Sequence, residues 1–376
     1  MSLKKTLKPG TDSFKVTVFI VISSLVVFSG AAVSFWDYYD PEKVFSEFET
    51  LQDQNHYNDR EDQNLNNSTD QSGEPEYKLP LKVNIVFLGL DRTEQVERFG
   101  REEVSGEVQT DAIIFATLDI REHKVKAITI TRDATVPIVS LGVIDKINHA
   151  YKYGERYGDG DDSISRSEEG IRYAVETVEN LMGAPVDFYI TIDIDDLINI
   201  VDMIGGIYYY VEQDIRADLG QGRVLIEEGY QHLDGVHFFY YVQYRDIYGR
   251  QQDRMDRHQR ILKSAFEQFR DTGNISKIPS IFDALKSSIN TNLSSRHIGA
   301  LARFGRELDM EDIEFYSFEG EGIFTELGYY YYIDEEHRAE VLDEMLGVEV
   351  KELGVVKGTP VEEDDEADSG LNLFSD

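Results

Sequence analysis

Several short apolar runs lie along the middle of the chain. Runs typical of buried strands cover residues 81–90, 111–120 and 125–131, and two more cover 186–193 and 206–214. The third run continues into "TRDATVPI", so a strand with alternating isoleucines and threonines ends in the charged pair Arg132 and Asp133. The pattern therefore predicts several half-buried or buried strands.

Helical repeats of apolar positions lie between and after these runs. Apolar side chains recur on one helical face between 170 and 183, and Gly183 is expected to end that helix. A second helix is expected over 194–206, ended by Gly205, and a long one over about 251–271. Because strands and helices are interleaved, the sequence predicts an α/β fold with a central mixed β-sheet.

The N-terminal region predicts a membrane anchor. The run from Val16 to Trp36 carries no charge and is long enough to cross a bilayer as one helix. Four lysines precede it and aspartates follow it, so residues 1–15 are expected in the cytoplasm and the rest outside. The alternative is a cleaved signal peptide with its cut site near Ser29 to Ala32, but the apolar run continues beyond these small residues.

Composition divides the rest of the chain into three parts. Residues 37–77 are acidic and amide-rich and predict a solvated stalk, with helix possible over 41–52. Residues 78–350 predict one globular domain, and 351–376 predict an acidic disordered tail. The formal net charge of −35 makes nucleic acid an improbable partner, so an anionic substrate would need local arginines or a divalent cation. No cysteine is present, which excludes disulfides and a cysteine nucleophile.

Two carboxylates stand at strand boundaries. Asp91 follows one apolar strand and Asp111 opens the next, so they meet at one edge of the sheet if these strands are neighbours. Paired carboxylates suit Mg²⁺, which prefers oxygen ligands and keeps several waters. The alternative is that Asp91 begins a turn and Asp111 merely starts a strand.

Arginines gather in "YVQYRDIYGRQQDRMDRHQRIL", at Arg245, Arg250, Arg254, Arg257 and Arg260. Several guanidinium groups together suit a diphosphate, because each matches two phosphate oxygens. A solvated helix face neutralised by nearby aspartates is the alternative. Arg132 and Lys146 are further candidates, although a salt bridge for Arg132 and a solvent-facing Lys146 are the simpler interpretations.

Seven stretches in order resemble the LytR-CpsA-Psr family of bacterial envelope proteins. They are "NIVFLGLDR", "TDAIIFATLDI", "ITITRDATVPI", "DKINHAYKYG", "AVETVENLMGAPVDFYITIDIDDLINIVDMIGGI", "GYQHLDGVHFFYYVQYR" and "DRMDRHQRIL". Weaker agreement continues to about residue 347, so the resemblance covers nearly all of the predicted domain, and the single N-terminal anchor fits it.

The resemblance implies a transferase outside the membrane. Such proteins take a glycopolymer from an undecaprenyl-diphosphate carrier and attach it to peptidoglycan through a phosphodiester. Their fold is a central sheet with helices on both sides and an apolar pocket for the lipid. A catalytically weak lipid-diphosphate binding or regulatory protein, of the transcriptional attenuator type, is the alternative, and a hydrolase of the lipid diphosphate is a third.

The resemblance also assigns roles to residues. It implies that Asp91 and Asp111 hold Mg²⁺, and that the acceptor hydroxyl is activated by Asp133 or Asp91. The residues implied to bind phosphate or act in catalysis are Arg132, Lys146, Arg245, Arg254, Arg257 and Gln259. Gln109, Gln243 and His258 stand where the family commonly has two arginines and a glutamine. Arg92, Arg250 and Arg260 are the residues that could compensate for the missing cations.

Overall fold

The computed structural model describes most of the predicted domain and part of the segment before it. The described residues are 38–48, 81–91, 108–216, 223–244, 251–271, 277–286, 289–355 and 357. The predicted cytoplasmic tail and anchor, 1–36, lie outside them, as does most of the predicted acidic tail. Among the described residues, no helix combines the length and the apolar character needed to cross a bilayer.

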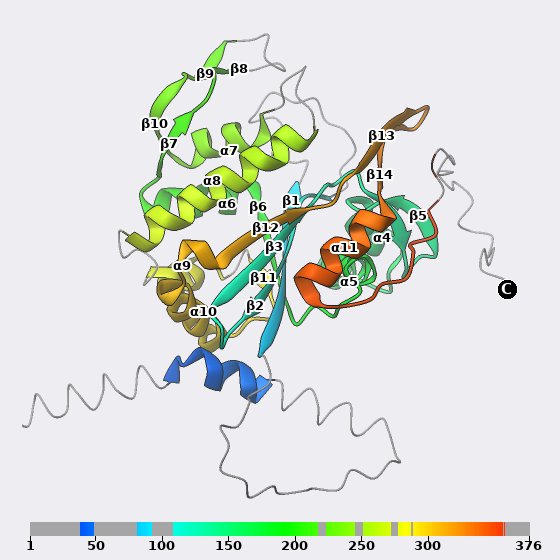
Figure 1. Cartoon of the computed structure of the whole chain (residues 1–376), viewed down its shortest axis with the longest axis horizontal. Helices are drawn as coiled ribbons and strands as arrows, with labels where there is room; N and C mark the ends of the chain where they lie inside the picture. The colour runs from blue at the N-terminus through cyan, green and yellow to red at the C-terminus, as the bar shows by residue number, and fades with distance from the viewer. Residues whose placement is uncertain are drawn as a thin grey trace, which may run out of the picture.

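A six-stranded mixed sheet forms the centre of the domain (Figure 1). Its order is β11-β6-β1-β2-β3-β12, where β1, β2 and β3 are antiparallel neighbours. Strand β6 runs parallel to β1, and β12 runs parallel to β3, which confirms the predicted mixed sheet. The bounds are β1 Lys82–Asp91, β2 Gln109–Asp119, β3 Lys124–Ile130, β6 Phe188–Asp193, β11 Asn290–Thr291 and β12 Ile313–Ser317.

One face of the sheet is covered by α4 (His149–Tyr157), α5 (Ser163–Met182) and α11 (Glu335–Leu346). Helix α5 begins at Asp162, whose carboxylate accepts hydrogen bonds from the amides of Ile164 and Ser165 at 3.0 and 2.9 Å. It ends at Gly183, which takes the left-handed conformation (φ 63°) that favours glycine, as predicted. Buried side chains of α5 and α11 pack with those of β1, β2 and β3 into one apolar core.

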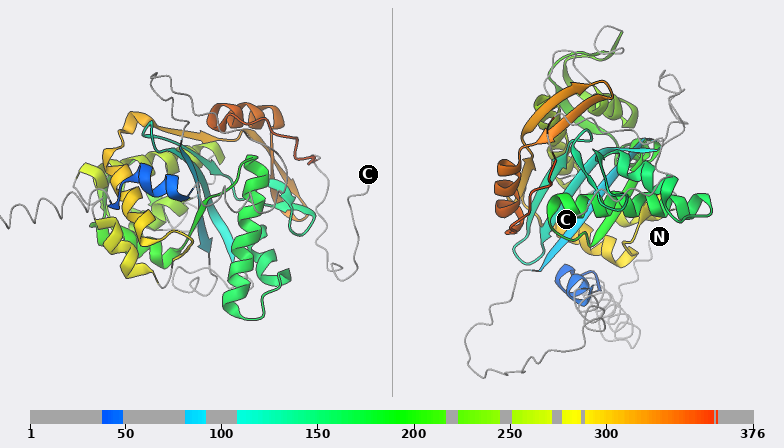
Figure 2. Two further views of the ribbon diagram at one scale, coloured as in Figure 1. Left: turned by 90° about the horizontal axis from the view of Figure 1, so that it is seen from below. Right: turned by 90° about the vertical axis from the view of Figure 1, so that its right-hand side faces the viewer.

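The opposite face carries two groups of helices, so helices flank the sheet on both sides (Figure 2). Helices α9 (Ile278–Leu285) and α10 (Ser295–Glu307) cover the half where β1 begins. Helices α6 (Ile194–Ile204), α7 (Gly235–Gln243) and α8 (Gln251–Asp271) cover the half where β1 ends. The predicted helices at 194–206 and 251–271 are thereby confirmed.

Four two-stranded antiparallel sheets accompany the central sheet among the described residues. Strand β7 (Ile207–Val211) pairs with β10 (Gly229–Leu233), and β8 (Ile215–Arg216) pairs with β9 (Val224–Ile226). Strand β4 (Thr135–Ile138) pairs with β5 (Val143–Lys146), and β13 (Gly320–Thr325) pairs with β14 (Gly328–Ile333). A 3₁₀ turn, η3 (Met310–Asp312), leads into β12.

Residues 41–48 form a helix against the end of the sheet where β1 begins (Figures 1 and 2). Val44 and Phe45 are buried there with Leu81 and Phe188. This part of the predicted solvated stalk is helical, as the sequence allows, but it packs on the domain. Residues 37 and 49–77 of the predicted stalk lie outside the described residues.

Candidate active site

A register shift between β1 and β2 brings the two strand-end carboxylates to one place. Gly89 pairs with Ala112 and Leu90 pairs with Thr110, so Asp111 has no partner across the ladder. Such a bulge re-aims the extra side chain. Asp111 and Asp91 consequently both line the same cavity, as expected if the two strands are neighbours.

The cavity has a volume of about 330 Å³ and lies between the sheet and helices α6, α7 and α8. Phe87, Ile114 and Thr129 form one row across β1, β2 and β3 and line its sheet side. Leu197, Phe239 and Ile261 line its helix side. Gly89 and Ala112 face each other in the next row, and a Cβ on Gly89 would lie 2.9 Å from that of Ala112, so glycine is required at position 89.

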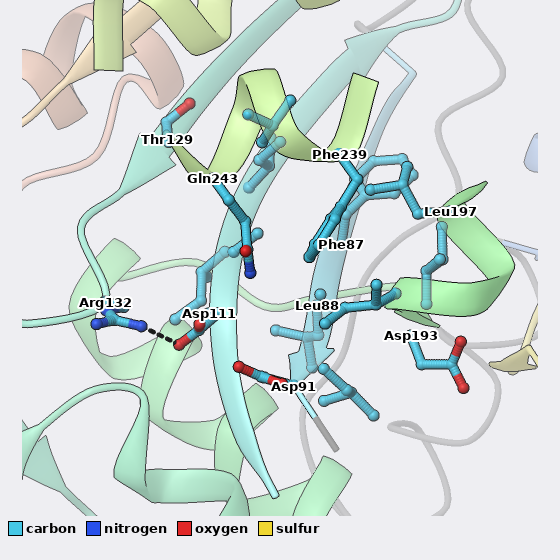
Figure 3. Close-up of a pocket in the computed structure, with 18 of the residues that line it drawn as sticks. Phe87, Leu88, Asp91, Asp111, Thr129, Arg132, Asp193, Leu197, Phe239 and Gln243 are labelled. Carbon is cyan, nitrogen blue, oxygen red and sulfur yellow. Dashed lines mark hydrogen bonds and ion pairs between the residues drawn. The ribbon is translucent and has the colours of Figure 1, made fainter. Parts of the chain in front are cut away.

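Asp91, Asp111, Arg132 and Gln243 stand together at one end of this largely apolar cavity (Figure 3). Nη1 of Arg132 lies 2.5 Å from Oδ1 of Asp111, and its Nε lies 3.9 Å from Oδ2 of Asp133. Gln243 projects from the end of α7 toward this end of the pocket (Figure 3). We call the group Asp91, Asp111 and Arg132 the rim of the cavity. An apolar cavity with such an ionic rim suits a ligand that has an apolar part and a charged part.

The Arg132 guanidinium is held in its charged form. Burial alone would lower its pKa, but the negative charges of Asp111 and Asp133, with a smaller effect of Asp91, raise the pKa above its ordinary value. Arg132 thus forms a salt bridge, the simpler interpretation of the sequence, although its partner Asp111 is on strand β2, and Arg132 itself also lines the pocket.

Asn148 ties the Arg132 segment to β2. Its backbone amide donates to the carbonyl of Arg132 at 3.2 Å, and its carbonyl accepts from the amide of Thr110 at 3.4 Å. Its side-chain amide donates to Oε1 of Gln109 at 3.1 Å. Asn148 is only 3% exposed, so it is part of the packed support behind the rim.

Two predicted phosphate ligands lie away from the pocket wall. The Lys146 ammonium is 4.6 Å from the ring centre of Tyr330 on β14. The Arg257 guanidinium donates to the carbonyl of Tyr244 and lies 5.8 Å from the ring of Tyr241. Neither side chain lines the cavity in this arrangement.

The other predicted ligands are described partly or not at all. Arg254 and Gln259 belong to α8, but their side chains are outside the described part of the chain, and Arg92 and Arg245 lie outside it entirely. Their assignment to phosphate stays a prediction.

Sequence reasoning did not single out Asp193 or Thr129, which also line the pocket. Asp193 lies on the far side of the pocket from Arg132 (Figure 3) and caps α6, accepting from the amide of Asp196 at 2.8 Å. An aspartate directly before an apolar helix signals that cap, but no sequence signal places it in a cavity wall.

The described residues contain no group of three or more histidine or carboxylate side chains suited to a metal ion. The pocket does offer two oxygen-donor carboxylates, Asp91 and Asp111, beside a cation. Mg²⁺ is commonly held by one or two carboxylates with substrate phosphates and water, so this donor set fits that ion only together with a phosphorylated ligand.

The fold and the rim define a class of protein: a mixed-sheet α/β domain with an apolar cavity closed at one end by paired carboxylates and an arginine. The sequence profile of the LytR_cpsA_psr family matches residues 44–347. The chain belongs to this family.

Individual relatives cover different shares of the chain. An uncharacterized protein of Staphylococcus aureus (strain NCTC 8325) is 27% identical over 231 residues, 61% of this chain and 53% of that protein, so the chain spans about half of its length. The polyisoprenyl-teichoic acid–peptidoglycan teichoic acid transferase TagU of Halalkalibacterium halodurans is 30% identical over 239 residues, 63% of this chain and 72% of TagU. The crystal structure of Bacillus subtilis TagV superposes with a TM-score of 0.54 and 25% identity, covering 71% of this chain and 97% of TagV.

Proposed function

We propose that this chain is a phosphotransferase that moves a glycopolymer from an undecaprenyl-diphosphate carrier to a peptidoglycan acceptor through a phosphodiester. The observation that carries the proposal is the convergence of Asp91, Asp111 and Arg132 at one end of an apolar cavity. The name of the TagU relative, a transferase between a polyisoprenyl-linked polymer and peptidoglycan, supports it.

The carrier would bind with its diphosphate at the rim and its first isoprene units in the cavity. A volume of 330 Å³ is at the lower end of the range of about 300–1,000 Å³ for small-ligand sites, so it suits only the part of the lipid next to the diphosphate. Phe87, Leu197 and Phe239 supply apolar surface for it.

In the reaction, an acceptor hydroxyl oxygen bonds to the phosphorus that carries the glycan. The bond from that phosphorus to the bridging oxygen breaks, and the lipid phosphate leaves with the electron pair. Arg132 stabilises the negative charge that develops on the leaving group, in a site where apolar walls exclude water. Its raised pKa keeps it cationic at any physiological pH.

Asp133 is the residue to which we assign the proton of the acceptor hydroxyl. Its carboxylate is beside Arg132, whereas Asp91 and Asp111 are the two carboxylates in the pocket wall that suit a cation. A bound Mg²⁺ would supply further neutralisation of phosphate charge. Arg245, Arg254, Arg257, Lys146, Arg92 and Gln259 remain proposed as further phosphate ligands.

The site of action would be the outer surface of the cell membrane. The support is in the sequence, where the uncharged run 16–36 follows four lysines and precedes the acidic part of the chain. A protease-protection measurement on intact cells and on membrane vesicles would test it, since cleavage of the domain only after lysis would contradict the proposed orientation.

The test of the activity is transfer of a labelled glycan from polyprenyl diphosphate to peptidoglycan by the full-length chain with Mg²⁺. We expect Arg132→Ala to lower the rate about 10²- to 10³-fold, because it removes one charged donor from the transition state. The matched control is Arg172→Ala, on α5, whose guanidinium pairs with Glu169 and Glu176 at the surface.

Each result of that assay has a meaning. An Arg132→Ala variant as active as the wild type would overturn the role of the rim. A wild-type protein that retains the lipid but neither transfers nor cleaves would favour a binding or regulatory protein, and cleavage without transfer would favour a hydrolase.

A further inference from the structure

The hairpin β13–β14 presents aromatic rings to solvent. The Phe324 side chain is 83% exposed, the largest exposure among the large hydrophobic side chains of the described residues. Phe324 pairs across the hairpin with Tyr329, and their ring centres are 5.0 Å apart. Because burial of such a ring is strongly favourable, an exposed phenylalanine in contact with a half-buried tyrosine near a hairpin tip points to a binding surface.

Glycines make room for these rings. Gly322 and Gly320 share the hairpin face with Phe324, at alternate positions of β13. A Cβ at Gly322 would collide with the hydroxyl of Tyr329, and a Cβ at Gly320 would lie 2.9 Å from the ring of Tyr331. The tyrosine rings of β14 therefore lie against the backbone of β13, in an aromatic stripe that runs from the exposed Phe324 through the half-buried Tyr329 to Tyr331, which is buried at the base of the hairpin.

The base of the hairpin is attached to the candidate active site. The amide of Tyr331 donates to the carbonyl of Asp133 at 2.8 Å, and Tyr331 forms a parallel bridge with Ala134. Tyr329 is two residues along the same strand, about 7 Å away by the rise of a β-strand. The aromatic stripe is therefore continuous with the segment that carries Arg132 and Asp133.

The charges on the hairpin select between ligands. Glu319, Glu321 and Glu326 are exposed on or beside it. Glu321 pairs with Lys357 at 3.3 Å, and the ammonium of Lys146 lies against Tyr330, so the carboxylates outnumber the nearby cations. This surface therefore disfavours a polyanionic glycan, and its carboxylates accept hydrogen bonds from sugar hydroxyls. The apolar C–H face of a pyranose ring packs on an aromatic ring, so the combination suits an uncharged sugar.

We propose that β13–β14 is the acceptor subsite, where a sugar ring of an uncharged glycan stacks on Phe324 and Tyr329 while a neighbouring sugar presents its hydroxyl to Asp133. The inference rests on the proposed transferase function for its place in the reaction, but the binding itself does not depend on catalysis.

The experiment is a titration of the full-length, detergent-solubilised chain with a soluble tetramer of β-1,4-linked N-acetylglucosamine, followed by ligand-observed NMR. We expect Phe324→Ala to weaken binding about 3- to 10-fold, the loss of one stacked ring. Phe324→Tyr should bind like the wild type, and so should Tyr230→Ala, which removes an aromatic side chain that is 72% exposed on the remote strand β10.

The Phe324→Leu variant distinguishes stacking of the sugar on an aromatic ring from non-specific hydrophobic contact. A leucine keeps an apolar tip but has no ring, so the sugar should bind it as weakly as the alanine variant. Equal binding by the wild type, Phe324→Ala and Tyr230→Ala, or no binding by the wild type, would overturn the inference.

Failure of the proposed function gives a different result. A wild-type chain that binds the tetramer through Phe324 but transfers no glycan would leave the subsite standing and remove the transferase. A chain that transfers glycan while Phe324→Ala leaves the KM for the acceptor unchanged would remove only the subsite.

Discussion

At the scale of single residues, paired charges keep ionised groups inside apolar surroundings. Arg132 is held between Asp111 and Asp133, and their attraction outweighs the cost of burying the guanidinium. Removal of one partner would leave the other charge partly buried and unpaired. Each charged side chain of this group therefore needs its partner to stay ionised at low free-energy cost in a partly buried place.

Asp145 provides a second example and a prediction that depends on pH. Its carboxylate is 3% exposed and lies 2.6 Å from Nδ1 of His149, and it accepts from the Tyr153 hydroxyl at 2.5 Å. Burial alone would raise the pKa of Asp145, but the hydrogen bonds and charge of His149, with the bond from Tyr153, lower it. We expect Asp145→Asn to lower the free energy of unfolding by about 1–3 kcal/mol at pH 7.

The sign of the pH dependence follows from that lowered pKa. A carboxyl whose pKa is lower in the folded state stabilises the fold above its unfolded value, near 4, and this contribution is lost as the pH falls further. Urea unfolding at pH 7 and at pH 3.5 should therefore show a smaller difference between Asp145→Asn and the wild type at the lower pH. An equal difference at both values would contradict the ionic role of Asp145.

The pattern of strand ends predicted that Asp91 and Asp111 meet at one edge of the sheet if their strands are neighbours, and the family resemblance added Arg132. The structure places all three in one pocket wall. Neither the pattern nor the resemblance predicted that Lys146 stacks on Tyr330, because the ring comes from a hairpin almost two hundred residues later in the chain. The sequence shows which side chain stands at the end of a predicted strand. It does not show which element, distant along the chain, packs against that side chain.

At the scale of elements, small side chains in the sheet decide how deep the cavity is. Gly89 and Ala112 face each other across β1 and β2, while Phe87 and Ile114 form the next row on the same face. A larger side chain at position 112 would extend into the space that the lipid is proposed to fill.

Ala112→Leu should therefore weaken binding of polyprenyl diphosphate by tenfold or more. Three further carbon atoms at the cavity floor compete with the lipid, whereas Ala112→Gly leaves the space open and serves as the control. Affinity measured by lipid-retention mass spectrometry, with thermal unfolding in parallel, separates lost binding from lost stability. Undiminished affinity in a folded Ala112→Leu protein would show that the lipid does not use this space.

Helix boundaries were more predictable than the bulge that shapes the site. Gly183 and Gly205 end α5 and α6 because left-handed backbone favours glycine, and that preference is local. The register shift after Gly89 depends on how β2 lies against β1, so no local pattern announces it.

At the scale of the whole molecule, the segment before the domain is part of its packing. Glu47, Asp40 and Glu42 form ion pairs with Arg296, Arg303 and Arg121, at 2.5, 3.2 and 3.1 Å. These pairs are partly exposed, so each stabilises the docked helix only slightly, and the burial of Val44 and Phe45 stabilises it more. Two apolar side chains in an acidic segment were too weak a pattern to predict this docking.

Phe45→Ala should destabilise the domain by about 3–5 kcal/mol, the usual cost of removing a buried phenylalanine ring. Phe45 is 1% exposed and its ring centre is 5.9 Å from that of Phe188 at the start of β6. Lys43→Ala, at an exposed position of the same helix, should leave the unfolding free energy within about 0.5 kcal/mol of the wild type. Denaturant unfolding measures both, and a loss below about 1 kcal/mol for Phe45→Ala would mean that this helix is dispensable.

The docked helix also sets the distance between the start of the domain and the candidate active site. It packs near Phe188, which pairs with Ile85, and six residues of β1 then lead to Asp91, a rise of about 20 Å. If the segment before Tyr38 is embedded in a bilayer, a carrier must lift its head group over that height while its other end stays among the acyl chains. We expect long polyprenyl carriers to reach the site and short ones to fail, and transfer rates in vesicles with carriers of graded length would reveal such a limit.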